Sequence, residues 1–360
     1  MPKSRPKVQK PRNWLAKCWA KGLAQKILIV SLLLVTAWII TMYGIAQWYI
    51  HSQKNTQLEL GTSFIPYYAQ SLGVDPQETM DAMIGIGVKH FRLVSYWNVG
   101  EPEPGKYNFD DLDWQFKKAE DANAKVILTL GLRQPRWPEC HAPKWAEGQT
   151  RQQWQPALEK YIAVVVERYK DSPALDKYQL ENEYFLKGFG ECTDFSRERL
   201  ISEYNLVKKL DPKREIVVPR SNNALGFPVG QPQPDEFSIS IYKRVWDAGV
   251  TKRYLEYPFP AWFYGYIAGV QMIFNERNMI LGELQGEAWP PNGKPIPQAS
   301  LDEQNKSIDA KRLQDRFEFG EATGMREIYL WGGEYWYYRK VVLNDPSLWN
   351  VAQQEFDVNK

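Results

Sequence analysis

The chain has 360 residues, of which 44% are hydrophobic, which suits one large globular domain or two small ones. The formal net charge of +2 hides an asymmetry, because residues 1–26 carry eight Lys or Arg side chains and no acidic residue. Residues 27–360 therefore have a formal net charge of −6, and this mildly acidic balance argues against a nucleic-acid partner. Only three Cys and three His are present, without metal-ligand spacing, so we expect no metal and no cofactor.

Residues 27–50 form an uncharged, mostly apolar run, long enough to span a bilayer, which needs about 20 residues. The basic segment at 1–26 should stay in the cytoplasm. We therefore predict a single-pass anchor in the cell membrane and an extracytoplasmic domain of residues 51–360. A cleaved signal peptide is the alternative, because Gly44-Ile45-Ala46 offers small residues for cleavage. Against it, the apolar run exceeds a signal core of about 7–15 residues.

Beyond residue 57, short apolar runs alternate with amphipathic segments, a pattern typical of successive β/α units and a parallel sheet. Eight strands are expected, at 58–65, 90–96, 125–131, 177–183, 215–219, 237–242, 279–283 and 326–332. Helices are expected at 75–85, 110–123, 155–170, 196–210, 261–275 and 301–319. The helix at 75–85 should begin with a capping box at Asp75 and with Pro76 at its first position.

Eight such units in about 300 residues predict a (β/α)8 TIM barrel of the α/β class, preceded by one transmembrane helix. The apolar helix at 261–275 is too short to span a membrane and is interpreted as the sixth barrel helix, with lipid contact as the alternative. A doubly wound open sheet is the alternative fold. No Gly-rich phosphate loop follows the first strand, which disfavours that fold.

Two of the apolar strands end in a carboxylate, the fourth in Glu183 and the seventh in Glu283. Active sites of TIM barrels lie at the C-terminal ends of the strands. A carboxylate that ends an apolar strand is costly unless it has a partner or a function. Strands that are three apart bring their ends to opposite sides of the barrel opening. Glycoside hydrolysis needs two carboxylates in such an arrangement.

At these residues the chain resembles clan A of the glycoside hydrolases, in particular families 42, 35 and 5. Asn182-Glu183 and Glu283 match the carboxylate pair of the clan. The second-strand region agrees, because it reads Arg92-Leu93-Val94-Ser95-Tyr96-Trp97, then Glu101-Pro102-Glu103-Pro104-Gly105-Lys106-Tyr107-Asn108-Phe109, then Leu112-Asp113. The third strand with the following Pro135 and Trp137 resembles family 42, and the run 181–184 resembles family 35. The resemblance covers most of residues 58–340, but residues 284–289 match no single family and leave the substrate open.

The resemblance implies a retaining β-glycosidase that acts on an oligosaccharide or polysaccharide, with Glu183 as acid/base and Glu283 as nucleophile. Arg92 would keep Glu283 ionised, and Tyr242 would donate a hydrogen bond to it. Asn182 would bind the 2-hydroxyl of the sugar. The other expected contacts with substrate are Trp97, Trp331 as a platform under the sugar, and Glu334, which could instead be solvated. The abundance of Trp and Tyr, 15 and 20 residues, suits stacking against sugar rings.

Several alternatives stay open on the sequence alone. Glu181 is expected on the same side of its strand as Glu183, but deeper in the barrel. Glu287 rivals Glu283, which we favour because the apolar run stops there. Cys140 and Cys192 could form a disulfide in an exported domain or remain free thiols. The alternative function is a catalytically inactive, membrane-tethered barrel that only binds glycans.

Overall fold

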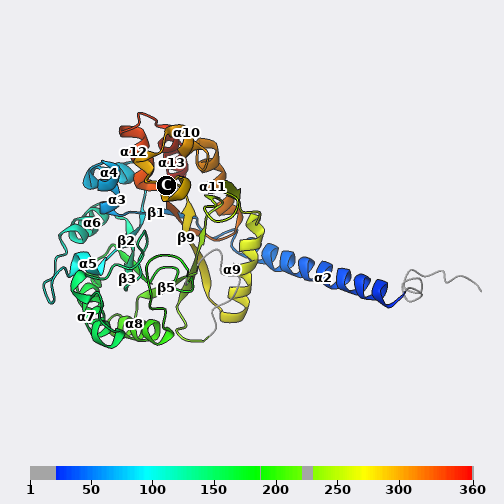
Figure 1. Ribbon diagram of the computed structural model, residues 1–360, viewed down its shortest axis with the longest axis horizontal. Helices are drawn as coiled ribbons and strands as arrows, with labels where there is room; N and C mark the ends of the chain where they lie inside the picture. Colours follow the sequence, from blue (N-terminus) through cyan, green and yellow to red (C-terminus); the bar gives the residue numbers. More distant parts are fainter. Residues whose placement is uncertain (1–21, 187, 221–229, 359–360) are drawn as a thin grey trace, which may run out of the picture.

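The computed structural model describes residues 22–186, 188–220 and 230–358. Within these residues, eight parallel strands close into a barrel surrounded by helices (Figure 1), which confirms the predicted (β/α)8 fold and excludes the open sheet. In order around the barrel, the strands are β1 (Glu59–Ser63), β2 (His90–Val94), β3 (Lys125–Leu130), β4 (Leu175–Leu180), β5 (Glu215–Arg220), β6 (Glu236–Ile241), β9 (Asn278–Gln285) and β10 (Glu327–Trp331). We call the C-terminal ends of these strands the mouth of the barrel and their N-terminal ends its lower end.

Helices connect the strands and cover the outside of the barrel. They are α3 (Pro66–Leu72), α4 (Pro76–Gly85), α5 (Trp97–Gly100), α6 (Asp110–Asp121), α7 (Arg151–Tyr169), α8 (Arg197–Leu210), α9 (Ala261–Asn275), α10 (Leu301–Asn305), α11 (Ala310–Ala322), α12 (Gly333–Val341) and α13 (Ser347–Val358). Asp75 caps α4 as expected, because its carboxylate accepts a hydrogen bond of 2.8 Å from the N–H of Glu78. The helix expected at 301–319 is divided into α10 and α11, because Asp309 caps a new helix by accepting from the N–H of Arg312 at 2.8 Å.

The fourth strand ends three residues earlier than predicted. β4 stops at Leu180, and the chain then turns through left-handed backbone at Glu181 (φ 61°) and Glu183 (φ 40°). Non-glycine residues adopt such angles rarely. The alternation of side chains along a strand therefore does not extend to these two residues.

The seventh barrel strand is longer than predicted and contains a bulge. β9 continues beyond Glu283 to Gln285, and its pairing with β6 shifts by one residue at Gly282, so that Ser240 faces Glu283. Gly282 fits this position because a Cβ atom there would lie 2.9 Å from the side chain of Ser238. The bulge changes which residues of β9 point into the barrel near its mouth.

Side chains fill the interior of the barrel in layers. At the lower end, Lys177 forms ion pairs with Glu236 at 2.7 Å and with Glu327 at 2.5 Å. An apolar layer follows, made of Ile127, Val217, Ile280 and Tyr329. The polar residues nearer the mouth rest on this packed layer, which makes their support rigid.

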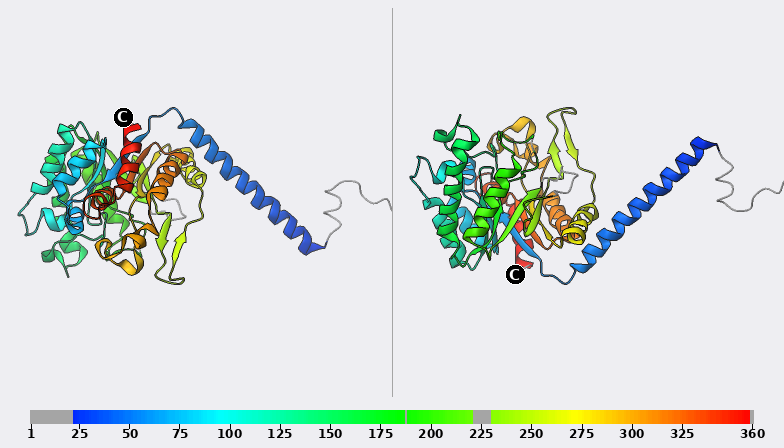
Figure 2. Two further views of the ribbon diagram at one scale, coloured as in Figure 1. Left: turned by 90° about the horizontal axis from the view of Figure 1, so that it is seen from above. Right: turned by 90° about the horizontal axis from the view of Figure 1, so that it is seen from below.

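The N-terminal helix α2 (Leu23–Ser52) projects from the side of the barrel (Figures 1 and 2). It contains the predicted anchor 27–50, and residues 25–52 are long and apolar enough to cross a membrane. Most side chains before residue 42 are exposed, whereas Met42, Ala46 and Tyr49 are buried against the barrel. Of the predicted basic segment 1–26, residues 1–21 lie outside the described part of the chain.

Helix α9 is the sixth barrel helix, as predicted, and it is also the element on which α2 packs. Two glycines four residues apart, Gly265 and Gly269, face α2. A Cβ atom at Gly269 would lie 2.9 Å from the side chain of Ile45, and one at Gly265 would lie 3.2 Å from that of Ile50. Small residues at this spacing let two helices approach closely, so the last turns of α2 are part of the folded domain.

Candidate active site

Glu283 lies at the mouth and is held by two hydrogen-bond donors. Nη1 of Arg92 on β2 is 2.7 Å from Oε1 of Glu283, and the hydroxyl of Tyr242 donates to Oε2 at 2.6 Å. Glu283 is only 5% exposed, so these donors replace the water that its carboxylate loses. Both contacts are those that the resemblance implied.

The guanidinium of Arg92 on β2 joins four strands at the mouth, because it also donates to the hydroxyl of Ser63 on β1 at 3.4 Å. Besides Glu283, it donates to Oε1 of Gln179 on β4 at 2.6 Å and to Oδ1 of Asn182 at 2.8 Å. Arg92 is 2% exposed, and a planar guanidinium with all its partners in place has little freedom to move. The orientation of Asn182 is therefore coupled to that of Glu283 through one side chain.

Glu181 does not lie where strand alternation predicted it. Its carboxylate accepts from the N–H groups of Leu132 at 2.7 Å and Arg133 at 3.0 Å, and it forms an ion pair of 2.7 Å with Arg199 on α8. The left-handed backbone after Leu180 turns it toward the loop after β3 rather than deeper into the barrel. Glu181 is fully buried and has a structural role, because it holds this loop and α8 together.

Glu183 is nearly buried, at 7% exposure, and its environment disfavours the charged form. Burial raises the pKa of its carboxyl group to about 8, and the negative charges of Glu283 and Glu139 act in the same direction. A hydrogen bond with Ser240 on β6 acts in the opposite direction. At neutral pH the mouth thus presents a protonated carboxyl group near a carboxylate bound to a cation, and such a pair can both donate a proton and attack as a nucleophile.

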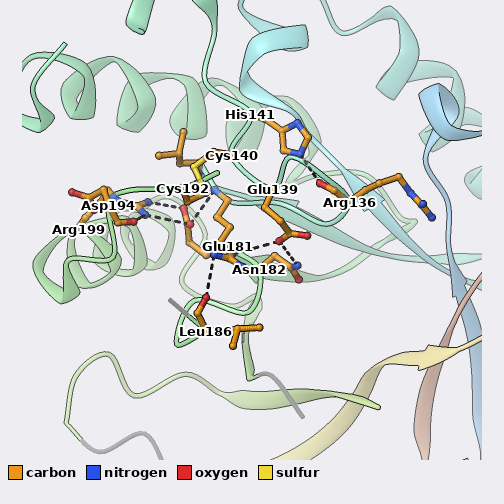
Figure 3. Close-up of a disulfide and its surroundings, with 12 residues drawn as sticks. Arg136, Glu139, Cys140, His141, Glu181, Asn182, Leu186, Cys192, Asp194 and Arg199 are labelled. Atoms are coloured by element: carbon orange, nitrogen blue, oxygen red, sulfur yellow. Dashed lines mark hydrogen bonds and ion pairs between the residues drawn. A yellow bond between two sulfur atoms is a disulfide. The ribbon is translucent and has the colours of Figure 1, made fainter. Parts of the chain in front are cut away.

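Glu139 is a third carboxyl group at the mouth, which the sequence analysis did not single out. Its Oε2 accepts from Nδ2 of Asn182 at 2.9 Å and lies 3.4 Å from Nε of Arg133 (Figure 3). Burial raises its pKa to about 7, although the contact with Asn182 lowers it. Glu139 lies in an irregular loop without periodicity, and its only sequence signal is the neighbouring Cys140.

A disulfide between Cys140 and Cys192 ties the loop after β3 to the loop after β4 (Figure 3). The two Cα atoms are 5.1 Å apart, which is an ordinary separation for such a bond. The structure thus has the bridge rather than the two free thiols. The bond restrains Glu139, the residue before Cys140, and thereby the contact with Asn182.

Glu287, the rival of Glu283, belongs to a separate cluster at the mouth. It accepts from Arg136 at 3.3 and 3.1 Å and from the indole N–H of Trp331 at 2.8 Å. The guanidinium of Arg136 also stacks on the rings of Tyr68, at 3.2 Å, and Trp331, at 4.4 Å. Trp331 is 6% exposed, so the expected sugar platform is in contact with Arg136 in this conformation.

Two other predicted contacts with substrate are covered by the protein itself. Trp97 is fully buried, and its indole N–H donates to Glu101 at 2.7 Å. Glu334 is 1% exposed and not solvated, because it accepts from the N–H of Ile65 at 2.6 Å. Burial raises the pKa of Glu334 to about 7. Both side chains support the rim of the mouth here, and their contact with a sugar stays a prediction.

The described residues offer no group of three His, Cys, Asp or Glu side chains that could hold a metal ion. The chemistry that the mouth itself can carry is proton transfer and nucleophilic attack by carboxyl groups, with Arg92 and Asn182 as fixed donors and acceptors.

Comparisons with known proteins point to the same class. The model of glycoside hydrolase family 42, described as beta-galactosidase, matches residues 70–212. A probable mannan endo-1,4-beta-mannosidase F of Aspergillus oryzae is 27% identical over 142 residues, which are 38% of this chain and 30% of that protein. The beta-galactosidase LacZ of Lactobacillus acidophilus is 29% identical over 134 residues, which are 32% of this chain and 20% of that protein. The chain thus aligns with less than a third of the length of either relative.

Solved structures share the fold at low sequence identity. A GH5_18 protein of Bifidobacterium longum subsp. infantis has a TM-score of 0.56 and 12% identity, over 84% of this chain and 79% of that one. A catalytic mutant of Gan42B, a GH42 beta-galactosidase from G. stearothermophilus, has a TM-score of 0.54 and 13% identity, over 84% of this chain and 56% of that one. Xylanase 10B of Thermotoga petrophila has a TM-score of 0.51 and 16% identity, over 77% of this chain and 82% of that one. The family model, the curated relatives and the barrel together support a glycoside hydrolase of clan A.

Proposed function

We propose that this protein is a retaining β-glycosidase in which Glu283 is the nucleophile and Glu183 the acid/base. The observation that carries the proposal is the unequal environment of the two carboxyl groups. Glu283 has a guanidinium at 2.7 Å and a phenol at 2.6 Å, which favour its negative charge. Glu183 has a pKa raised to about 8 and is protonated at neutral pH. Retaining glycosidases need this division of protonation states.

In the first step, a carboxylate oxygen of Glu283 attacks the anomeric carbon while Glu183 gives its proton to the glycosidic oxygen. The bond to the leaving group breaks, and a glycosyl ester forms on Glu283. The ester is neutral, so the charge that helped to keep Glu183 protonated is gone. Glu183 then takes a proton from water, whose oxygen attacks the anomeric carbon and releases Glu283. Two inversions at one carbon retain its configuration.

Asn182 is proposed to bind the 2-hydroxyl of the sugar. Its Oδ1 accepts from Arg92, and one of its two amide N–H bonds is directed to Glu139. The second N–H bond is the one that we assign to the substrate. Because Arg92 and Glu139 fix the amide from both sides, the contact is pre-organised and costs little ordering when the sugar binds.

The test uses the full chain in detergent micelles with aryl β-glycosides. Mannosides and galactosides come first, because the curated relatives are named as a mannosidase and a beta-galactosidase. Glu183→Gln should lower turnover by about 10²- to 10⁴-fold, the usual contribution of an acid/base group, and Glu283→Gln by at least as much. Glu287→Gln is the matched control, for which we expect a loss within roughly tenfold.

A 2-deoxy-2-fluoro glycoside of the sugar that is hydrolysed identifies the nucleophile directly. Fluorine destabilises the oxocarbenium-like transition state, so the glycosyl ester accumulates and can be located by peptide mass mapping. We expect the ester on Glu283, and an ester on Glu287 would overturn the assignment. If no glycoside is cleaved but sugars raise the melting temperature of the folded chain, the barrel only binds glycans.

We also propose that α2 is retained as a single-pass anchor, with residues 1–26 in the cytoplasm. The exposed part of the run 27–50, before Met42, would lie in the membrane, and the last turns of α2 would lie outside with the barrel. The apolar length of α2 and the basic residues before it support this topology. N-terminal sequencing of the protein from membrane fractions tests it. A chain that still contains residues 1–26 is expected, and a chain that begins after Ala46 would mean a cleaved signal peptide.

A further inference from the structure

Helix α2 leaves the domain on the side of the mouth. The hydroxyl of Tyr49 is 3.4 Å from Oδ1 of Asn278, the first residue of β9 and therefore at the lower end. The ring of Tyr43 packs edge-on against Trp262, with the ring centres 5.6 Å apart. Trp262 is at the start of α9, and the N-terminal ends of barrel helices lie on the mouth side. From Tyr49 to Tyr43, α2 thus runs from the lower end toward the mouth, and its earlier residues continue beyond the barrel in that direction (Figure 2).

The exposed, uncharged part of α2 spans most of a bilayer. Residues 27–41 span about 22 Å at 1.5 Å per residue, compared with about 30 Å for the hydrocarbon core. Lys26 before them has a long side chain that can extend to the headgroups. Met42 is the first buried apolar side chain after them. The aromatic pair Tyr43 and Trp262 therefore lies where interfacial aromatics are common. The surface of the membrane would then lie beside the mouth-side end of α9.

A hairpin at the mouth projects to the same side of the barrel as α2 (Figure 2). Its strands, β7 (Arg244–Trp246) and β8 (Tyr254–Glu256), follow the C-terminal end of β6. The side chain of Val250 at its tip is 90% exposed, and Lys252 and Arg253 beside it are exposed as well. An apolar side chain flanked by cations suits the headgroup layer of an anionic membrane.

The tip of the hairpin has a defined conformation. The carboxylate of Asp247 accepts from the N–H groups of Gly249 at 3.0 Å, Val250 at 3.3 Å and Thr251 at 2.6 Å. The one acidic side chain of residues 247–253 is therefore directed into the turn. The ammonium of Lys252 donates to the carbonyl oxygen of Ala248, and Lys252 and Arg253 both remain exposed, so the tip has a net positive charge. A pre-ordered tip loses little conformational freedom when it meets a surface.

We propose that this hairpin tip rests in the headgroup layer of the bilayer that α2 crosses, so that the mouth faces the membrane. A single helix would let the barrel rotate about its axis, and the hairpin supplies a second contact that fixes the orientation. Given the glycosidase proposed above, on which this step rests, the substrate is a glycan carried by a lipid in the outer leaflet. A mouth held at the lipid surface meets such glycans at a high local concentration.

The membrane contact is tested without any assay of activity. The full chain with Cys18→Ser and Val250→Cys, labelled with an environment-sensitive dye, is reconstituted into vesicles of phosphatidylcholine and phosphatidylglycerol. Gln353→Cys on α13 is the matched control, because it is exposed and α13 lies at the opposite end of the barrel from the hairpin (Figure 2). We expect a blue-shifted emission and quenching by spin-labelled lipid at position 250 only. Equal behaviour at the two positions would overturn the proposal.

The substrate class is tested in the same vesicles by offering one glycan either free or attached to a lipid. The parent should cleave the lipid-linked form faster, and Lys252→Glu with Arg253→Glu should lower that rate about tenfold while leaving the rate on the free form unchanged. Equal parental rates on both forms would refute the lipid-linked substrate. If neither form is cleaved, the proposed glycosidase activity fails, and the fluorescence result still decides the membrane contact.

Discussion

At the scale of single residues, the candidate site depends on backbone angles that few residues adopt. Glu181 and Glu183 both have left-handed backbone, which costs on the order of 1–3 kcal/mol for each residue. The buried contacts of the Glu181 carboxylate with Leu132, Arg133 and Arg199 offset this cost. The strained backbone therefore lies at and next to the proposed acid/base, Glu183. Its left-handed turn directs the Glu183 side chain differently from the alternating side chains of β4.

The activity should fall at alkaline pH, because in the proposed mechanism Glu183 donates a proton in the first step. Its pKa of about 8 predicts that kcat/KM declines as the pH rises through about 8. The charge of Glu139 contributes to that value, so Glu139→Gln should move the decline to lower pH while its amide oxygen still accepts from Asn182. Profiles of kcat/KM against pH measure this. Glu334→Gln is the control, and an equal shift in that variant would contradict the account.

The buried carboxyl group of Glu183, which the proposed activity needs, should also lower the stability of the fold at alkaline pH. The pKa of Glu183 is about 8 in the folded state, compared with 4.5 for an unperturbed glutamate. The protonated group therefore contributes its full stabilisation below about pH 4.5, and this contribution is lost as the pH rises through about 8. Glu183→Gln removes this dependence. At pH 8.5 the inactive variant should melt at least about 2–4 °C above the parent, and the difference should shrink toward pH 5. Thermal unfolding at several pH values measures it, with the exposed Glu147→Gln as the control.

Part of the site could be predicted from the sequence, because strand ends in a barrel converge. Arg92, Tyr242 and Glu283 meet at the mouth as expected, since each lies on or next to a strand whose position the apolar pattern fixes. Glu139 and Arg136 could not be found in this way. They lie in a loop without periodicity, and left-handed backbone directs both of them.

At the scale of elements, the pattern of apolar runs located all eight strands but not their ends. The bulge at Gly282 depends on the neighbouring Ser238, a tertiary contact that no local pattern contains. The division between α10 and α11 is different, because Asp309 is an ordinary capping residue. That boundary was available from the sequence, and helical periodicity across it concealed the cap.

The disulfide joins the loops after β3 and β4, and the effect of removing it on stability should be easy to measure. Cys140 and Cys192 are 52 residues apart, and closing a loop of this length stabilises the folded state by about 4 kcal/mol through the entropy of the unfolded chain. Cys140→Ser with Cys192→Ser should lower the stability by roughly this amount in urea unfolding. Cys18→Ser is the control. A double variant as stable as the parent would mean that the bond adds nothing.

At the scale of the whole molecule, the anchor and the barrel share one core. Met42, Ala46 and Tyr49 of α2 are 6%, 0% and 0% exposed, so packing with α9 begins several residues before the boundary at residue 51 that the sequence predicted. Hydropathy alone could not predict this, because the same apolar residues suit lipid and protein equally. The close approach at Gly265 and Gly269 distinguishes the two surroundings.

A soluble fragment should therefore begin at Met42 rather than at Gln53. Removing residues 42–52 uncovers α9 and discards two large buried side chains, Met42 and Tyr49. At about 1.5–3 kcal/mol for each, the fragment 53–360 should be less stable than 42–360 by roughly 3–6 kcal/mol. Urea unfolding of the two fragments measures the difference. Equal stability would show that α2 contributes nothing to the barrel.

The bridge between Cys140 and Cys192 also has a consequence for when the protein becomes competent. A newly made chain in a reducing cytoplasm lacks this bond, and the loop that carries Glu139 is then untied from the loop after β4. Asn182 then loses the restraint from Glu139 on the amide that we propose to bind the sugar, and keeps only its contact with Arg92. With the topology proposed above, the bond would form only after the domain has left the cytoplasm, so the proposed site would be completed on export.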